Sequence, residues 1–472
     1  MTNVKLAGTY EVRQFGAQQF RKLPTDTRFV AVDWQERNTS ENNRGESLTF
    51  TIPPCPPNSL WLAHKMLFRL EVALCRGDGV DEDITNTNLL CPVNNILHSM
   101  IDSLVIKIGG EIINQATSYY PYKAFLSTLL NFGVPAKEHL ETAGWALDEY
   151  GSFLDTLKIE PDINHSTIED RGQLVRRHLF KNNPTGLNWE PVTSAWLKKS
   201  DFVDFQAPLF TDLEMCTGGI PPNVTMEVHM KISDPKFYMC AREQDARVRP
   251  YLDFKNPRLL IPLAVMSTEE NHIFRNIWMK EPFRLNMRRS QVKMHPIVTG
   301  SSSWQKACPY QEDSGLPANI FVGVVRAAAV QGDYELNPFH FIRYEAAYHI
   351  KDIWLSVGGK RMQEFVHVEA TKNTCMSFYQ QLMQVLGLAH TNMSPMMNYQ
   401  EFRNSCFIAG FDLTATHSNS RLLLPAIRTG EINVNISFSA KTTENLEAVL
   451  FSSHPSAMTI DFNGQTSGTF AP

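Results

Sequence analysis

One pattern occurs twice in the chain, and it restricts the possible folds more than any other feature. In residues 90–133 an apolar run leads into Gly109 and Gly110, and a helical pattern with an apolar stripe follows. A glycine pair between two apolar runs is typical of a tight hairpin, because glycine adopts positive φ at little steric cost. Pro121 suits the first turn of the helix, and Gly133 is placed to cap its C-terminus. We therefore expect a strand, a hairpin turn and a short helix here.

The same pattern returns in the second half of the chain. Three landmarks recur in the same order, at separations of 246, 249 and 253 residues: Pro92 and Pro338, Gly109 and Gly358, Leu129 and Leu382. The spacing between the landmarks drifts by only a few residues. An ordered set of this kind predicts that one structural module is used twice.

Most other apolar segments alternate with polar residues, which is the period of a half-buried β-strand. We expect strands in residues 48–52, 68–74, 101–108, 202–210, 224–232, 259–265, 283–294, 320–325, 341–349, 407–416, 432–438 and 446–451. Half-buried alternation favours antiparallel sheets, and two short helices are too few to cover them. The pattern predicts an all-β fold of two antiparallel β-sandwich modules in tandem, with short helices in the connections.

The spacing of these patterns suggests boundaries. We expect an N-terminal arm in residues 1–46, which packs on a neighbour or lies along the surface, a first module in 47–246 and a second in 247–462. Residues 463–472 are rich in Gly, Ser and Thr and indicate a flexible tail. The first module is longer after its helix, and the excess falls on polar, irregular residues. We assign residues of about 134–200, and 152–200 above all, to an insertion in that module.

Composition excludes several classes of protein. The chain has 472 residues, 43% of them hydrophobic and 20% charged, as expected for two or three globular domains. The net charge of −5 argues against a dedicated nucleic-acid-binding protein, which would normally carry a basic surface. The pairs Arg176-Arg177, Lys198-Lys199 and Arg288-Arg289 are therefore interpreted as solvated faces.

No membrane segment or targeting signal is expected. The chain contains no run of 18 apolar residues, and residues 1–16 lack the apolar core of a signal peptide. Its eight cysteines show no metal-ligand or CxxC spacing. They are expected to be reduced thiols with structural roles.

The chain shows no sequence motif of a catalytic, cofactor or metal site. It lacks HExxH, a Walker loop, GxGxxG and GxSxG, and its fourteen histidines are dispersed. His229 and His349 alternate with apolar residues, so they are expected to face solvent from strands. We predict no catalytic residue, no cofactor, no metal ligand and no enzymatic activity, although a site assembled from distant residues would not be visible in sequence.

Arg76-Gly77-Asp78 is the triplet that integrins recognise. The simpler interpretation is a turn at the end of a strand, where Gly and Asp are favoured. The second module has Gly332-Asp333 at the matching place, without the arginine. Turn chemistry therefore explains the motif better than receptor binding does.

Longer stretches resemble a known family. In residues 92–133 the run PVNNILHSMIDSLVIKIGGEIINQATSYYPYKAFLSTLLNFG is similar to the first-module signature of major capsid proteins from Polinton/Maverick elements and adintovirus-like viruses. The second half agrees through VTGSSSWQKACPY, LPANIFVGVVRAAAVQGDYELNPFHF and FIAGFDLTATHSNSRLLLPAIRTGEINVNISF. The likeness covers residues of about 48–461, while residues 77–87 and most of 152–200 match nothing in the family. Those loops are where members of the family vary.

The resemblance implies a double jelly roll and a structural role in a virion. It implies a homotrimer, because three chains with two similar modules each present six towers, a pseudo-hexagon that tiles an icosahedral facet. Its partners would be neighbouring capsomers and a minor or penton capsid protein, without a membrane span or specific nucleic-acid binding. The protein would be made in the host cytoplasm, assemble in the cytoplasm or nucleus, and belong to a double-stranded DNA virus or virus-like transposon.

Two other classes remain open from sequence alone. A β-sandwich binding protein, such as a lectin-like module or a viral attachment protein, would have a similar strand pattern. It would be a monomer or small oligomer with a ligand cleft. A jelly-roll enzyme of the cupin kind needs clustered metal-binding histidines, and the dispersed histidines of this chain argue against it.

Overall fold

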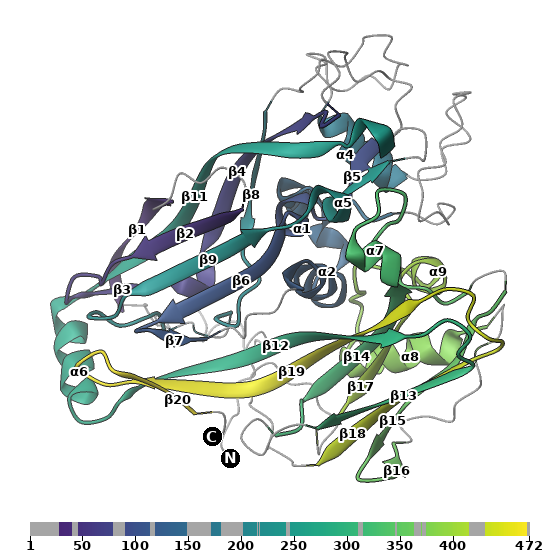
Figure 1. Cartoon of the computed structure of the whole chain (residues 1–472). Helices are drawn as coiled ribbons and strands as arrows, with labels where there is room; N and C mark the ends of the chain where they lie inside the picture. Colours follow the sequence, from purple (N-terminus) through teal and green to yellow (C-terminus); the bar gives the residue numbers. More distant parts are fainter. Residues whose placement is uncertain are drawn as a thin grey trace, which may run out of the picture.

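The computed structural model describes most of the chain. The described residues are 28–39, 46–78, 90–113, 119–148, 171–180, 202–214, 216, 218–241, 246–309, 315–344, 347–362, 370, 374–414 and 430–469. They form two β-sandwiches that lie side by side (Figure 1).

The first sandwich has two main antiparallel sheets. One contains, in spatial order, β1 (Phe29–Asn38), β11 (Tyr251–Met266), β4 (Leu67–Cys75) and β8 (Val203–Pro208), with β3 (Ser59–Trp61) also paired to β11. The other contains β2 (Ser47–Ile52), β9 (Met226–Ile232), β6 (Ile101–Ile108) and β7 (Glu111–Ile112). A small pair, β5 (Leu90–Pro92) with β10 (Met239–Ala241), stands apart from both sheets.

The second sandwich is built in the same way. Its first sheet contains β12 (Phe283–Ile297), β19 (Leu446–Ile460), β14 (Asn319–Arg326) and β17 (Ile408–Asp412), with β20 (Thr466–Thr469) also paired to β19. Its second sheet contains β13 (Ser303–Pro309), β18 (Glu431–Phe438), β15 (Ile350–Val357) and β16 (Lys360–Arg361).

The two sandwiches share one topology. When the short extra strands β3, β5, β10 and β20 are left out, each module has eight strands in chain order. In both modules strands one, eight, three and six form one sheet, and strands two, seven, four and five form the other. Two four-stranded antiparallel sheets connected in this way are a jelly roll. The all-β double jelly roll and the duplication are therefore confirmed, and β1 and β12 are counterparts.

Strand pairing corrects the boundaries expected from the sequence. Strand β1 lies inside the expected arm of residues 1–46, yet it pairs with β11 and belongs to the first module. Strand β11 lies beyond residue 246, yet it pairs with β1, β3 and β4 of the first module. The physical reason is the topology, which places the first strand of a jelly roll beside its last. The first module therefore runs from β1 to Met266, and the junction between modules follows at α6 (Thr268–Trp278).

The C-terminal residues also differ from the expectation. Within the expected tail of residues 463–472, β20 adds an edge strand to β19, and Thr459 and Ser467 hydroxyls lie 2.7 Å apart across that pair. The Thr466 hydroxyl donates to the carbonyl of Gly109 in the first module. Backbone pairing thus holds residues 466–469 in the fold, and the flexible-tail prediction is wrong for them.

Short helices occupy the connections, as expected. Besides α6 they are α1 (Ile96–Ser99), α2 (Tyr120–Asn131), α3 (Lys137–Leu140), α4 (Arg171–Leu179), α5 (Pro235–Tyr238), α7 (Ala327–Gln331), α8 (Met376–Val385) and α9 (Tyr399–Asn404). Four 3₁₀ turns lie at residues 63–65, 134–136, 141–143 and 246–248. In the described part of the chain no helix is long and apolar enough to cross a membrane. Helix α4 and the flanking residue 180 are the described portion of residues 149–201, so most of the expected insertion lies outside the described residues.

The repeated hairpins form as predicted. Gly109 and Gly110 have φ of 59° and 90° between β6 and β7, and Gly358 and Gly359 have φ of 56° and 78° between β15 and β16. Gly133 does not cap α2, because the helix ends at Asn131, the C-cap residue Phe132 is extended, and Gly133 itself has φ of −99°. A Cβ at residue 133 would lie 2.9 Å from the carbonyl oxygen of Ser394. Gly133 is needed for a close approach between the two modules.

In the second module one local prediction is wrong and one strand was missed. Residues 341–349 form no named strand in their described part, because hydrogen bonds to the end of α9 hold the segment in an irregular path: the Phe341 amide donates to Ser405 and Arg343 Nε to the Arg403 carbonyl. Strand β13, in contrast, was not predicted. It is a polar segment that pairs along its whole length with β18.

Candidate functional site at the junction of the jelly rolls

Helix α2 lies between the two jelly rolls and carries the contact between them (Figure 1). Every residue from Tyr120 to Leu130 is buried. A helix buried on all sides is unusual for a connection in a β-protein, since such a helix normally covers one face of a sheet and exposes the other. The sequence predicted the helix and an apolar stripe, but not that its remaining faces are also enclosed.

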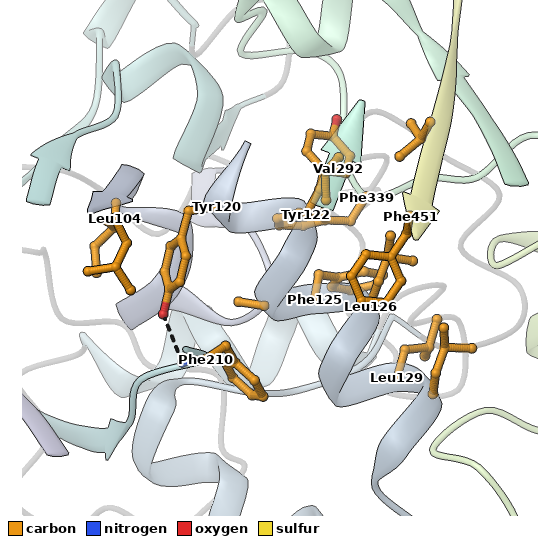
Figure 2. Close-up of a cluster of buried hydrophobic side chains, with 14 of the residues drawn as sticks. Leu104, Tyr120, Tyr122, Phe125, Leu126, Leu129, Phe210, Val292, Phe339 and Phe451 are labelled. Atoms are coloured by element: carbon orange, nitrogen blue, oxygen red, sulfur yellow. Dashed lines mark hydrogen bonds between the residues drawn. The ribbon is translucent and has the colours of Figure 1, made fainter. Parts of the chain in front are cut away.

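Aromatic side chains fill the junction beside α2 (Figure 2). Phe125 stacks on Phe339 of the second module with ring centroids 4.5 Å apart. Tyr122 meets Phe339 edge-on at 5.5 Å and Phe341 at 6.4 Å, and its hydroxyl donates to the Pro338 carbonyl at 2.8 Å. Aromatic pairs add about 0.5–1.5 kcal/mol each beyond the burial of their area. The cluster therefore fixes the second module against α2.

A buried ion pair crosses the same junction. Lys123 Nζ of α2 lies 2.6 Å from Asp212 Oδ1, in the loop after β8. Asp212 Oδ1 also accepts the backbone N–H of Ser290 in β12, at 3.0 Å. The two charged side chains are 6% and 2% exposed. Breaking a buried pair by removing one partner typically costs about 3–5 kcal/mol. The pair thus ties α2, the loop of the first module and β12 of the second into one arrangement.

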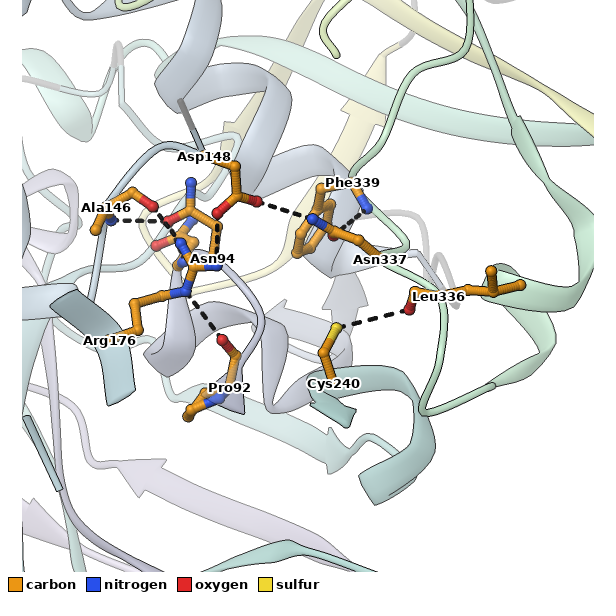
Figure 3. A network of polar contacts seen from close by, with 10 residues as sticks. Pro92, Asn94, Ala146, Asp148, Arg176, Cys240, Leu336, Asn337 and Phe339 are labelled. Atoms are coloured by element: carbon orange, nitrogen blue, oxygen red, sulfur yellow. Dashed lines mark hydrogen bonds and ion pairs between the residues drawn. The ribbon is translucent and has the colours of Figure 1, made fainter. Parts of the chain in front are cut away.

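A second polar network lies nearby (Figure 3). Arg176 of α4 donates to the carbonyls of Pro92 and Ala146 and pairs with Asp148 at 2.6 Å. Asp148 also accepts from Asn337 Nδ2 at 2.8 Å. Since Asn337 belongs to the second module, the network links α4 to both jelly rolls.

Burial of Arg176 and Arg289 corrects the interpretation of the pairs Arg176-Arg177 and Arg288-Arg289 as solvated faces. Arg176 is 1% exposed, and Arg289 is 8% exposed and donates to the Ile113 carbonyl at 3.0 Å. Both guanidinium groups satisfy backbone carbonyls that come from distant parts of the chain, so neighbouring residues in the sequence gave no sign of their burial. Arg288 is partly buried at the same junction. Lys198-Lys199 lies outside the described residues.

A cavity of about 410 Å³ lies between the modules, beside the ion pair of Lys123 and Asp212. Residues of both modules line it, among them Asn95, Lys123, Asn319 and Ser453. Asn95 Nδ2, Asn319 Oδ1 and Ser453 Oγ have no hydrogen-bond partner among the described residues. A cavity with such polar atoms is suited to ordered water. The described residues contain no group of three or more His, Cys, Asp or Glu placed to hold a metal ion.

The structure buries one histidine that the sequence did not single out and leaves the two expected strand histidines partly exposed. His98 of α1, which sequence analysis did not single out, is 1% exposed and its Nδ1 lies 3.0 Å from the Tyr120 hydroxyl of α2. Burial lowers the pKa of His98 to about 3, so the ring is neutral. His229 is 34% exposed on β9, beside Glu227 and Thr49, which fits a strand histidine at the surface. His349 is partly buried just before β15, and burial lowers its pKa.

The integrin-like triplet forms a turn in which its two charged side chains pair. Arg76 pairs with Asp78 at 2.6 Å, and these side chains are only 10% and 16% exposed. The Gly77 amide donates to the Val248 carbonyl, and a Cβ there would lie 2.5 Å from the Arg249 oxygen. The arginine and the aspartate are thus engaged with each other, and close packing explains the glycine.

All eight cysteines are buried and form no disulfide. Burial raises the pKa of Cys55, Cys216 and Cys406 to about 12. Thiols in this state are poor nucleophiles. Buried thiols of this kind are what is expected of cysteines with structural roles, and their reduced state stays a prediction.

Comparison by sequence finds a distant relative of the chain. No family model matches the chain. An uncharacterized protein of Caenorhabditis elegans is 21% identical over 400 residues, which are 81% of this chain and 83% of that protein.

Three solved structures resemble the chain over nearly its whole length. A chain of the Sputnik virophage has a TM-score of 0.63 at 10% identity and covers 99% of this chain and 93% of its own length. The Faustovirus major capsid protein has a TM-score of 0.56 at 8% identity, with 96% and 93% covered. The mavirus major capsid protein has a TM-score of 0.53 at 11% identity, with 100% and 97% covered. The chain therefore has the fold of viral major capsid proteins, a double jelly roll.

Proposed function

We propose that the chain is a major capsid protein that self-assembles as homotrimers into the icosahedral shell of a double-stranded DNA virus or virus-like transposon. One observation carries this proposal. Two jelly rolls of the same strand order stand side by side and are fixed to each other through one buried junction. A duplicated, rigid pair of modules is suited to tiling a surface, whereas a binding protein does not need the second copy.

Symmetry explains the use of two modules. Most homo-oligomers have closed point-group symmetry, and a three-fold ring of two-module chains contains six similar units. Six similar units present near-sixfold edges, and such edges pack against equal neighbours in a flat array. The duplication supplies these edges without requiring six separate chains.

The junction supports the proposal energetically. A shell of many copies needs each chain to hold its two modules at a constant angle. The stacked pair Phe125 and Phe339, the buried pair Lys123 and Asp212, and the Arg176 network all cross or support this contact. Packed interiors of this kind resist continuous deformation.

The finer assignment to the Polinton/Maverick and adintovirus-like family is also a proposal. It is supported by the sequence motifs in residues 92–133 and in the second half of the chain. Neighbouring capsomers and a minor or penton capsid protein are the proposed partners, and the virion is the proposed location. Catalysis has no part in this role.

Electron microscopy of the purified full-length chain tests the proposal. We expect particles with a pseudo-hexagonal outline and three-fold averages, or closed shells. Particles with only two lobes, the size of a single chain at every concentration, would contradict the proposal. They would direct attention to the β-sandwich binding-protein alternative and to glycan and receptor screens.

A further inference from the structure

The two counterpart helices α2 and α8 differ on one face. Phe125 and Leu129 of α2 correspond to Phe378 and Leu382 of α8, and all four are buried. The same alignment matches Lys123 to Met376 and Ser127 to Gln380. Lys123 and Ser127 are 5% and 6% exposed, whereas Met376 is 51% exposed and Gln380 is exposed. The face that α2 buries in the junction is therefore open on α8.

The partner of this face inside the chain is the first strand of the next module. Helix α2 packs against β12, whose Arg288 and Ser290 line the junction cavity together with Lys123 and Ser127. The counterpart of β12 in the first module is β1, at the edge of its sheet. Three apolar side chains at alternate positions of β1 are exposed: Val30 (72%), Val32 (47%) and Trp34 (51%). The chain thus has an open helix face and an open first-strand face.

We propose that the face of α8 containing Met376 and Gln380 docks on the Val30, Val32 and Trp34 face of β1 in a second copy of the chain. The contact repeats between chains what α2 and β12 do within the chain. Because helix and strand are different surfaces, the contact is head-to-tail, and a head-to-tail contact whose rotation closes after three copies gives the proposed trimer. The inference rests on the proposed trimer and assigns its interface.

The chemistry of the two faces fits this docking. Val32 and Trp34 lie on one face of β1, with Val30 at the irregularity next to them, and exposed apolar side chains that lie together are typical of interaction surfaces. Trp contributes strongly at protein interfaces, and Met adapts its shape to irregular partners. The internal junction has the charged pair Lys123 and Asp212 at the corresponding place. The open faces carry no charged residue at Met376, Gln380, Val32 or Trp34, and the apolar side chains among them associate without a charge partner.

Single charge substitutions test the inference on the full-length chain. We expect Trp34→Asp and Met376→Asp each to convert a trimer into a monomer, measured by light scattering after gel filtration. Val298→Asp is the matched control, since Val298 is 65% exposed and belongs to neither α8 nor β1, but follows β12. The Val298→Asp protein should remain a trimer, and all three should give the circular dichroism spectrum of the unchanged chain.

Each outcome separates the interface from the proposed function. If the unchanged chain is a trimer and both Trp34→Asp and Met376→Asp stay trimeric, the interface is wrong and the capsid proposal stands. If the unchanged chain is a monomer at all concentrations, the capsid proposal fails and the interface with it.

A cross-linking experiment decides the question if a charged variant fails to fold. The double variant Trp34→Cys with Met376→Cys is treated with a short bis-maleimide. The native cysteines are buried, so the introduced thiols should react first. We expect covalent trimers, while the pair Trp34→Cys with Val298→Cys should give none. Covalent monomers alone from the first pair would overturn the inference.

Discussion

Helices α2 and α8 follow the same hairpin in two copies of one module, but they lie in different surroundings. Helix α2 is buried on every side between the jelly rolls, and α8 keeps one face open. The residues at the matched apolar positions, Phe125 and Leu129 in α2 and Phe378 and Leu382 in α8, are buried in both copies. At another matched position, α2 has the buried Lys123 and α8 has the exposed Met376. The comparison shows that the buried apolar positions of the repeat are kept in both copies, while the position of Lys123 and Met376 differs with the surroundings of the helix.

The largest effect is expected from giving α2 the residue of α8. The substitution Lys123→Met leaves the buried Asp212 carboxylate without its lysine, and we expect a loss of about 3–5 kcal/mol in unfolding free energy. Equilibrium urea unfolding measures it. The double variant Lys123→Met with Asp212→Asn should recover part of this loss. A single-variant loss below about 1 kcal/mol would show that the pair does not hold the junction.

Acid should weaken the α2 side of the molecule through His98. Because burial lowers the folded-state pKa from 6.5 to about 3, stability is fully present above the unfolded value and is lost as pH falls toward the folded value. Each pH unit below about 6.5 costs up to about 1.4 kcal/mol, or about 2 kcal/mol by pH 5. Urea unfolding between pH 7 and about pH 5 measures the slope. The variant His98→Asn should show a shallower slope, and an identical slope would contradict this assignment.

A smaller loss is expected where the second module joins the Arg176 network. Asn337→Ala removes the donor to Asp148 and the acceptor of the Phe339 amide. We expect a loss of about 1–2 kcal/mol, because hydrogen bonds to charged groups are the stronger ones. Thermal unfolding followed by circular dichroism measures it. Asn463→Ala, on the turn before β20, is a control that should leave the transition unchanged.

The smallest effect is expected from the reverse exchange, Met376→Lys. The side chain is 51% exposed, so the folding of a single chain should change by no more than about 0.5 kcal/mol. Urea unfolding at a dilution in which both proteins are monomeric measures it, since oligomers would add stability by mass action. A loss near that of Lys123→Met would mean that α8 is as enclosed as α2, and the comparison would fail.

The module architecture was predictable because its signals are local. Alternation in residues 48–52 and 226–232 and the Gly-Gly hairpins depend on neighbours within a few residues, and all of them form as expected. The sequence placed β1 in the arm and β11 in the second module. The two strands pair with each other across more than 200 residues, and a pairing over such a separation leaves no local pattern. The duplication held the missing signal. Since the second module begins with a strand at Phe283, the first needs a counterpart before residue 47, and the apolar residues 29–34 supply it.

The junction was less predictable than the modules. The sequence indicated α2 and the landmarks Pro92 and Pro338. The Pro92 carbonyl accepts a hydrogen bond from Arg176, and the Pro338 carbonyl accepts one from the Tyr122 hydroxyl. It did not indicate that Arg176 is buried, because a charge pair in a polar region is typical of a solvated surface. Its three acceptors come from other segments of the chain. Contacts between distant segments carry no local pattern, so only the three-dimensional structure reveals them.

The most direct test of the capsid account is the solution mass of the full-length chain, by light scattering after gel filtration. One chain has a mass of 53.6 kDa. The account predicts a stable species of three times that mass, because three chains supply the six jelly rolls of a pseudo-hexagonal capsomer. A species of 53.6 kDa that persists at high protein concentration would contradict it.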